Sequence, residues 1–312
     1  MLTNFFGKSY SINFIVLFAF ILLYALISFL GFPSESKLTL GYIMECAGLF
    51  GLVLLYCFII GFILSKNKLA INNSYIFFVF VAFFGFFPEV FRDPDTLLFN
   101  ILLLVFLYKI VSLRNPAFFY KKLFDCGLWL AVLFIFNTFS LAFGFLIFLL
   151  VYISQKLDYR TVLIPVLGFS APLFILFAYY FWGDKLEDFY SFFNWNFSYD
   201  YEIYFLGPYA KPIWIVSFFS VIAFLFKAPK AFFVSGNYRK YWIAVIFTLV
   251  LSIAYVLLKN PKNGSELLIV FFPTSMMIGN WIGSVSNKII KEIILFLFLL
   301  LPGFLFIFNI KG

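Results

Sequence analysis

The 312-residue sequence is 64% hydrophobic and 12% charged, carries a net charge of +8 and contains no histidine. Its mean hydropathy of +1.05 excludes an ordinary soluble domain, and many apolar runs reach the roughly 20 residues that a helix needs to cross a bilayer. Helices satisfy their own backbone hydrogen bonds in lipid, so we predict an all-α polytopic membrane protein. Without histidine, the chain cannot build a His-ligated haem or His-box metal centre, which leaves carboxylates, lysine or tyrosine for acid–base chemistry.

Hydropathy predicts about eleven transmembrane helices. In chain order they cover residues 12–31, 40–64, 74–90, 95–112, 123–138, 141–155, 162–182, 212–227, 241–258, 266–284 and 290–309. The first run is too long for the core of a signal peptide, so we expect it to be retained. The fifth and sixth runs are short and meet at a polar tip, residues 137–140. The sequence leaves open whether this pair crosses the bilayer or forms a hairpin that dips into it.

The distribution of charge predicts the orientation. With the N-terminus in the cytoplasm, inner segments hold 15 of the 22 basic residues, and outer segments or outer span ends hold 11 of the 14 acidic ones. Lysine and arginine favour cytoplasmic loops, so we predict an N-in protein of the bacterial inner membrane. The net positive charge then follows from topology, and membrane lipid rather than nucleic acid is the expected partner.

We predict that residues 1–312 form a single membrane-embedded domain, since no stretch is long enough for a soluble domain. The longest outer loop, residues 183–211, is rich in aromatic and acidic side chains. Apolar positions recur in it at helical spacing: Leu186, Phe189, Tyr190, Phe193 and Phe197. This pattern predicts a short helix that lies in the membrane interface.

The best candidate site is a polar cluster between the third and fourth predicted spans, formed by Glu89, Arg92, Asp93 and Asp95. Clustered carboxylates bind divalent cations or act as general bases, and an adjacent arginine binds phosphate. The same segment is suited to begin a helix, with Asp95 near the N-cap. Both interpretations remain open, and so does the cofactor, for which a divalent cation is one option.

Two further acids and two lysines join the candidate set. Glu45 lies about 7 Å inside the second span, where an acid either serves a function or extends its carboxylate to the surface. Glu35 is the one acid of the first outer loop. Lys259 and Lys262, in a turn rich in Pro, Gly and Asn, are suited to bind an anionic headgroup or a lipid-linked phosphate.

Several segments carry a resemblance to a known group of proteins. They are SKNKL (65–69), FPEV (87–90), residues 97–113, FDCGLW (124–129), NGSEL (263–267) and FP (272–273). With these segments, most of the chain resembles a flavobacterial family of polytopic inner-membrane proteins that has no established activity. The resemblance implies an inner-membrane location and no particular reaction.

The layout is also similar to that of the GT-C membrane glycosyltransferases. The shared features are an acidic loop between spans three and four, a short hairpin of spans five and six, and a seventh span with Pro165 and Pro172 that leads to a long outer loop. GT-C enzymes carry a long first outer loop with a catalytic acid, whereas the first outer loop here, residues 31–39, is short. The resemblance implies use of a polyprenyl-phosphate-linked sugar at the outer face, by an active enzyme or a catalytically retired relative.

Three functional hypotheses follow. In the first, a GT-C-like protein handles a polyprenyl-phosphate-linked sugar: Glu35, Glu45, Glu89, Asp93 or Asp95 supplies catalysis, and Arg92, Lys259 or Lys262 binds phosphate. In the second, the chain is a non-catalytic subunit or assembly factor of an envelope complex and docks membrane-protein partners through its aromatic outer loop. In the third, it is a transporter with Glu45 as the proton-coupling acid.

Overall fold

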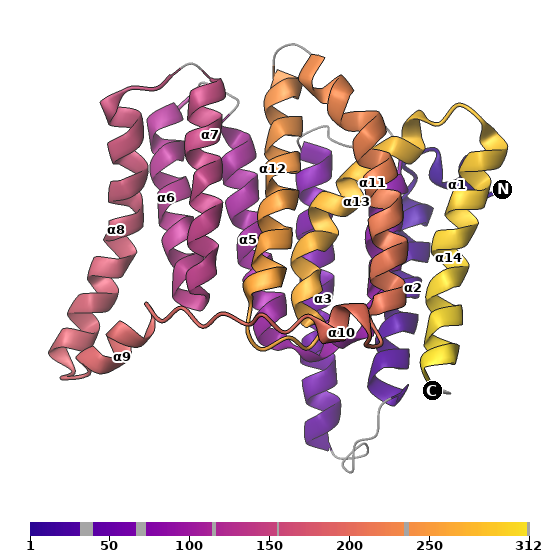
Figure 1. Cartoon of the computed structure of the whole chain (residues 1–312), viewed down its shortest axis with the longest axis horizontal. Helices are drawn as coiled ribbons and strands as arrows, with labels where there is room; N and C mark the ends of the chain where they lie inside the picture. Colours follow the sequence, from indigo (N-terminus) through magenta and orange to yellow (C-terminus); the bar gives the residue numbers. More distant parts are fainter. Residues whose placement is uncertain (32–39, 67–72, 114–116, 155, 234–236, 311–312) are drawn as a thin grey trace. The chain divides into compact units, whose positions relative to one another are not determined.

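The computed structural model describes the whole chain except residues 32–39, 67–72, 114–116, 155, 234–236 and 311–312 (Figure 1). Every regular element in the described ranges is helical, and no strand occurs there. The predicted all-α class is therefore confirmed.

In chain order, the helices are α1 (Leu2–Phe6), α2 (Ser11–Gly31), α3 (Leu40–Lys66), α4 (Tyr75–Phe86), η1 (Pro88–Arg92), α5 (Pro94–Ser112), α6 (Phe119–Phe136), η2 (Thr138–Gly144), α7 (Phe145–Ile153), α8 (Tyr159–Trp182), α9 (Leu186–Ser191), α10 (Glu202–Phe205), α11 (Ala210–Phe233), α12 (Asn237–Leu258), η3 (Ser265–Leu267), α13 (Leu268–Ser284) and α14 (Lys288–Ile310). The η elements are short 3-10 helices, which are common as connectors between longer helices.

Each of the eleven predicted spans overlaps a helix, but the described helices differ in their suitability to cross a membrane. Six are long and apolar enough by length and composition: Ser11–Phe29, Leu40–Lys66, Pro94–Ser112, Tyr159–Trp182, Ala210–Lys227 and Ser265–Ser284. The third predicted span is shorter than expected, because α4 ends at Phe86 and a 3-10 helix follows it. Eleven crossings therefore stay a prediction.

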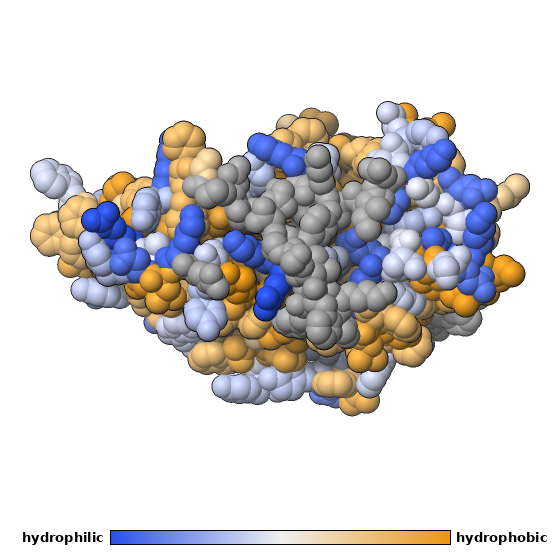
Figure 2. Space-filling model, turned by 90° about the horizontal axis from the view of Figure 1, so that it is seen from above, coloured by the Kyte–Doolittle hydropathy of each residue, from blue (hydrophilic) through white to orange (hydrophobic). Residues whose placement is uncertain are grey.

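The surface agrees with a membrane protein. Figure 2 looks onto one end of the helices and shows hydrophilic residues gathered on that face, with hydrophobic residues along its margin. Large apolar side chains on the helix flanks are exposed, among them Phe58, Phe174 and Ile175. Such side chains are stable outside the protein core when lipid covers them.

The described chain divides into two compact units. Unit 1 comprises Met1–Leu98, Asp200–Pro229 and Lys262–Gly312, and unit 2 comprises Phe99–Tyr199 and Lys230–Pro261. We describe each unit by itself. The single domain expected over residues 1–312 stays a prediction.

The core of unit 1 is built around α4. Eleven of its twelve residues are buried, and it packs against α2, α13 and α14. A glycine allows close packing in two of these contacts. Between α13 and α4, a Cβ on Gly279 would lie 2.5 Å from Cα of Ile76, and between α4 and α14, a Cβ on Gly85 would lie 2.7 Å from Cβ of Pro302. A helix that is apolar all round, such as α4, is stable only when neighbours or lipid cover every face.

Unit 2 is organised by the contact between α6 and α8, which lie side by side in Figure 1. A Cβ on Gly127 would lie 2.0 Å from the carbonyl oxygen of Pro165, and one on Gly168 would lie 2.3 Å from that of Phe124. The two backbones therefore touch without intervening side chains. In lipid, such van der Waals packing of small residues is the main attraction between helices.

The outer loop of unit 2 differs in part from the prediction. The expected interfacial helix exists as α9, but it ends at Ser191. Phe197 lies beyond it in chain without helix, where the Ser198 backbone N–H donates to the Leu258 carbonyl at 3.2 Å. The extension of the helical spacing to Phe197 is wrong, because this segment pairs with a distant carbonyl instead of continuing the helix.

We predict that Gly127→Val lowers the melting temperature of the detergent-solubilised protein. The added side chain forces α6 away from α8, and overpacking of this kind costs about 1–3 kcal/mol or more. Gly48→Val is the matched control, since a Cβ at Gly48 meets no atom within 4 Å. Equal melting temperatures for the two variants would contradict the contact.

Candidate functional site

The predicted polar cluster lies in unit 1, where η1 contacts η3. Helix α10 lies at the same end, at the foot of α11 and α13 in Figure 1. We call this region the junction. It is made of ten residues from four segments: Glu89, Arg92, Asp93, Thr96, Tyr204, Tyr209, Lys262, Asn263, Ser265 and Glu266.

Asp93 caps the helix that follows it. Its Oδ1 accepts a hydrogen bond from the Thr96 backbone N–H at 3.0 Å, and its Oδ2 accepts one from the Thr96 hydroxyl at 2.7 Å. Helix α5 begins at Pro94, and a proline is well tolerated as the first helical residue. Asp93 is therefore the N-cap. Asp95, predicted to lie near the N-cap, follows two residues later in the first turn of α5, with its side chain exposed.

Ser265 joins this cap to the start of α13. Its Oγ lies 2.5 Å from Asp93 Oδ2 and 2.7 Å from Asn263 Oδ1, and its one proton serves one of these acceptors. The Ser265 backbone N–H donates to Asn263 Oδ1 at 3.1 Å. Ser265 and Thr96 are both buried. Asp93 therefore links two segments that lie far apart in the sequence.

Glu266 is a fully buried acid whose carboxylate is well satisfied. The Tyr204 hydroxyl donates to Oε1, which also accepts from the Gly264 N–H at 3.1 Å, and Oε2 accepts from the Asn263 N–H at 3.2 Å. Gly264 has a φ of +89°, and a Cβ there would lie 2.4 Å from the Tyr209 ring. Both the left-handed backbone and the close ring require glycine.

Glu89 differs from Glu266 because its Oε2 is buried without a hydrogen-bond partner among the described residues. Burial raises the pKa of this carboxyl above its ordinary value, and its own backbone N–H, the Tyr209 hydroxyl and the Arg92 charge offset the rise only in part. Burial also raises the pKa of Tyr209, which therefore keeps its proton at neutral pH; its hydroxyl donates to the Asn263 carbonyl at 2.9 Å.

Arg92 places a guanidinium beside Glu89. One of its terminal nitrogens donates to the Ser28 carbonyl at the end of α2, and the Ser28 hydroxyl donates to the Pro88 carbonyl at 2.7 Å. These bonds fix η1 against α2. The Arg92 side chain remains exposed to solvent, so its outer face can meet an anion.

Lys262 also belongs to the junction. Its ammonium donates to the Asp200 carbonyl at 2.8 Å and lies 4.0 Å from the centre of the Tyr201 ring and 5.8 Å from that of Tyr204. Burial lowers its pKa. Through these contacts, Lys262 holds the segment around α10 against the turn that precedes α13.

Other predicted site residues are not among the ten that make up the junction. Glu45 is exposed on α3, and Lys259 belongs to unit 2. Glu35 lies outside the described residues. In the described ranges, no group of three or more Asp, Glu or Cys side chains is arranged to hold a metal ion. The divalent cation considered above stays a prediction.

Sequence reasoning missed three contributors: Tyr204, Tyr209 and Glu266. Glu266 is the first residue of the predicted span 266–284, and the two tyrosines belong to the aromatic loop of residues 183–211, so their position in the sequence did not set them apart as site residues. One signal was available, since an acid at the edge of a span needs buried donors. One of these donors, the Tyr204 hydroxyl, comes from a loop 62 positions earlier in the chain, whereas the other two are the neighbouring backbone N–H groups of Asn263 and Gly264.

Taken together, the junction combines a buried carboxyl of raised pKa with an adjacent guanidinium. A carboxyl of this kind exchanges a proton closer to neutral pH than an ordinary glutamate does. A guanidinium binds phosphate or carboxylate through paired donors. The arrangement is suited to move a proton next to a bound anion.

A family described as "Family of unknown function (DUF6427)" matches residues 1–311. No curated protein matches the chain, and no solved structure does.

We predict that Tyr204→Phe destabilises the protein by about 1.5–3 kcal/mol, the usual worth of a hydrogen bond to a charged group. The variant keeps the ring and removes the hydroxyl that donates to Glu266. Tyr190→Phe is the control, because Tyr190 is 60% exposed. Thermal unfolding in detergent measures both, and an unchanged Tyr204→Phe midpoint would refute the role of this bond.

We predict that Glu89 makes stability fall as pH rises. A folded-state pKa above the ordinary value of 4.5 means that the folded protein binds this proton more tightly than the unfolded chain does. Stability is therefore lost from about pH 4.5 up to the folded pKa and stays reduced above it. Melting temperatures should show a smaller decline over this range in Glu89→Gln than in the wild type; parallel curves would contradict the prediction.

Proposed function

Since the chain belongs to the DUF6427 family over nearly its whole length, we propose a function for it on the basis of the junction. It is a GT-C-like integral membrane protein that handles a polyprenyl-phosphate-linked sugar at the outer face of the inner membrane. The observation that carries the proposal is the buried, unpartnered Oε2 of Glu89 next to Arg92.

Four junction residues have a direct role in this proposal. Arg92 and Lys262 bind the donor phosphate, and Glu89 accepts the proton of the attacking hydroxyl as the new glycosidic bond forms. The bond between sugar and phosphate breaks, and polyprenyl phosphate leaves with the electron pair. Asp93 holds η1 and η3 together and so positions Glu89 and Arg92. Asp95, Glu45 and Lys259 have no role in this version of the site.

The proposal also draws on the resemblances found in the sequence. The flavobacterial inner-membrane family supplies the cellular location, and the GT-C layout supplies the class of donor. The acidic loop between the third and fourth predicted spans corresponds to η1 and the first turn of α5. In this loop, the Asp93 carboxylate bonds to Ser265, just before α13, and the layout alone does not specify that contact.

An alternative function rests on a different observation. The outer loop of unit 2 and the helix end before it expose large aromatic side chains: Trp182 is 91% exposed, Tyr199 71% and Tyr190 60%. Exposed aromatics of this density serve as membrane-interface anchors or as contacts for another protein. A non-catalytic subunit of an envelope complex would use this loop to bind its partner.

We predict that Glu89→Gln lowers sugar transfer from polyprenyl phosphate in proteoliposomes by at least about 100-fold, as expected when a general base is removed. Arg92→Gln should mainly raise the donor concentration needed for half-maximal rate. Glu187→Gln, an identical change on the exposed face of α9, is the control. Full activity of Glu89→Gln would overturn the assigned role.

The alternative predicts a different result. The wild-type protein would then release no polyprenyl phosphate from the donor, and it would co-purify in mild detergent with a membrane protein. Replacing Trp182 and Tyr199 by serine should abolish that co-purification, whereas Glu89→Gln should leave it intact.

A further inference from the structure

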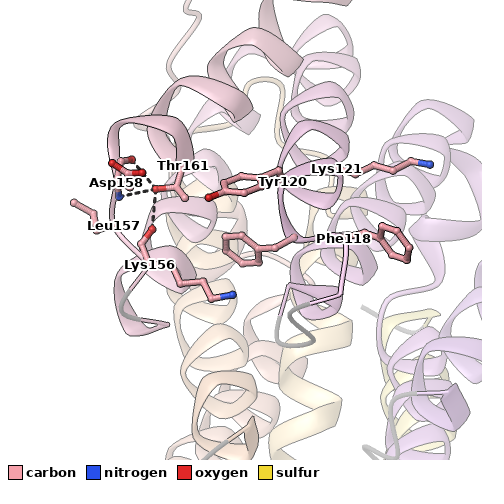
Figure 3. A pocket seen from close by; sticks show the side chains of 8 residues that line it. Phe118, Tyr120, Lys121, Lys156, Leu157, Asp158 and Thr161 are labelled. Atoms are coloured by element: carbon pink, nitrogen blue, oxygen red, sulfur yellow. Dashed lines mark hydrogen bonds between the residues drawn. The ribbon is translucent and has the colours of Figure 1, made fainter.

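A second feature, in unit 2, has no part in the proposed function. A pocket of about 760 Å³ opens between the first turn of α6 and the segment that leads into α8 (Figure 3). It is lined by Phe118, Phe119, Tyr120, Lys121, Lys156, Leu157, Asp158 and Thr161. Small-molecule sites have about this volume.

The walls of the pocket are held in place by defined contacts. Asp158 caps α8: its Oδ1 accepts from the Tyr159 N–H at 2.8 Å, and its own N–H donates to the Thr161 hydroxyl oxygen at 2.9 Å. The glycine contact between α6 and α8 fixes the distance between the two helices. The pocket is therefore built before any ligand binds.

The charges on the lining favour an anion. Of the charged lining residues, Lys121 extends away from the pocket (Figure 3) and Asp158 is engaged by the start of α8, which leaves the Lys156 ammonium as the available charge. In Figure 3 the Tyr120 hydroxyl points toward Thr161, and Lys156 extends from the segment that precedes α8. An anion bound by both Lys156 and Tyr120 would meet a positive charge and a hydroxyl donor.

Lys156 differs from the neighbouring basic residues. Lys109 pairs with Asp125 at 2.7 Å, Lys122 donates to the Ser112 carbonyl at 3.1 Å, and Arg160 donates to the Tyr159 hydroxyl at 2.9 Å. The Lys156 ammonium lies 4.4 Å from the centre of the Phe119 ring. Among the described residues it makes no hydrogen bond or ion pair, so a ligand can supply its counter-charge.

The rim of the pocket is apolar. Phe118 is 81% exposed and Leu157 63%, and both belong to the lining. A polar anionic head with an attached hydrocarbon would match this surface, with the head at Lys156 and the hydrocarbon against Leu157, the next residue in the chain. Basic residues near predicted cytoplasmic helix ends commonly meet anionic lipid headgroups.

We propose that this pocket binds a phosphate ester, with Lys156 as its charged partner and Tyr120 as a hydrogen-bond donor. The phosphate belongs either to an anionic phospholipid or to a soluble phosphate ester. The apolar rim favours the phospholipid, and the two sources are separated by experiment.

The test measures binding of two probes to the purified protein in detergent: phosphatidylglycerol in mixed micelles and glycerol 1-phosphate in solution. Lys156→Gln should weaken binding by about tenfold, the effect expected from losing one charge-assisted contact. Lys156→Arg should retain most of it. Lys185→Gln, which removes an exposed lysine next to α9, should bind as the wild type does.

Each outcome either supports or overturns the proposed phosphate-ester site. Loss of phosphatidylglycerol binding in Lys156→Gln supports the lipid source, and loss of glycerol 1-phosphate binding supports a soluble ester. Wild-type affinity of Lys156→Gln for both probes, or equal weakening in Lys185→Gln, overturns the proposal. Circular dichroism of each variant checks the helix content, and retained binding in Lys156→Arg separates charge from misfolding.

Discussion

The buried carboxylate of Glu266 imposes the constraint on which the junction depends. A charged group without water is stable only when donors surround it, and here they come from Tyr204 and the backbone N–H groups of Asn263 and Gly264. To supply them, the segment around α10 must fold back onto the start of α13, and Gly264 must adopt a left-handed backbone. The same turn presents Ser265 to Asp93 and thereby fixes η1. One acid thus orders three segments.

The two neighbouring glutamates show how environment separates structure from chemistry. Glu266 has its acceptors filled and holds the fold together, whereas Glu89 keeps one buried oxygen without a partner and a raised pKa. Strain or missing partners persist in a protein only when the surroundings are rigid, and such places tend to be functional. The rigidity here comes from the Asp93 cap and the bonds around Ser28. The pocket of unit 2 follows the same pattern: a capped helix start lies beside Lys156, which makes no hydrogen bond or ion pair among the described residues.

The helical class and the approximate position of every long helix could be predicted because hydrophobic runs report burial directly. The importance of residues 89–95 could also be predicted, since polar residues between apolar runs need a reason. The partners could not. Glu266 and Tyr204 are 62 positions apart, and Ser265 and Asp93 are 172 apart, so nothing local in the sequence pairs them. An acid near the start of α5 could be predicted as well, but not which acid caps the helix: Asp93 and Asp95 flank Pro94, both suit a helix start, and the bonds from Thr96 identify Asp93 as the cap.

The close approach of α6 and α8 at Gly127 and Gly168 has a consequence for how the sequence can change during evolution. Because each position faces a carbonyl oxygen of the other helix, neither tolerates a side chain while the other helix stays in place. A larger residue at one position therefore cannot be compensated by a smaller residue at the other, because glycine has no side chain to reduce. Relatives that keep this pairing should retain glycine at both positions together, whereas relatives that lose one should show a rearranged contact between these two helices. The pair is thus a marker by which the architecture of unit 2 can be followed through divergent sequences.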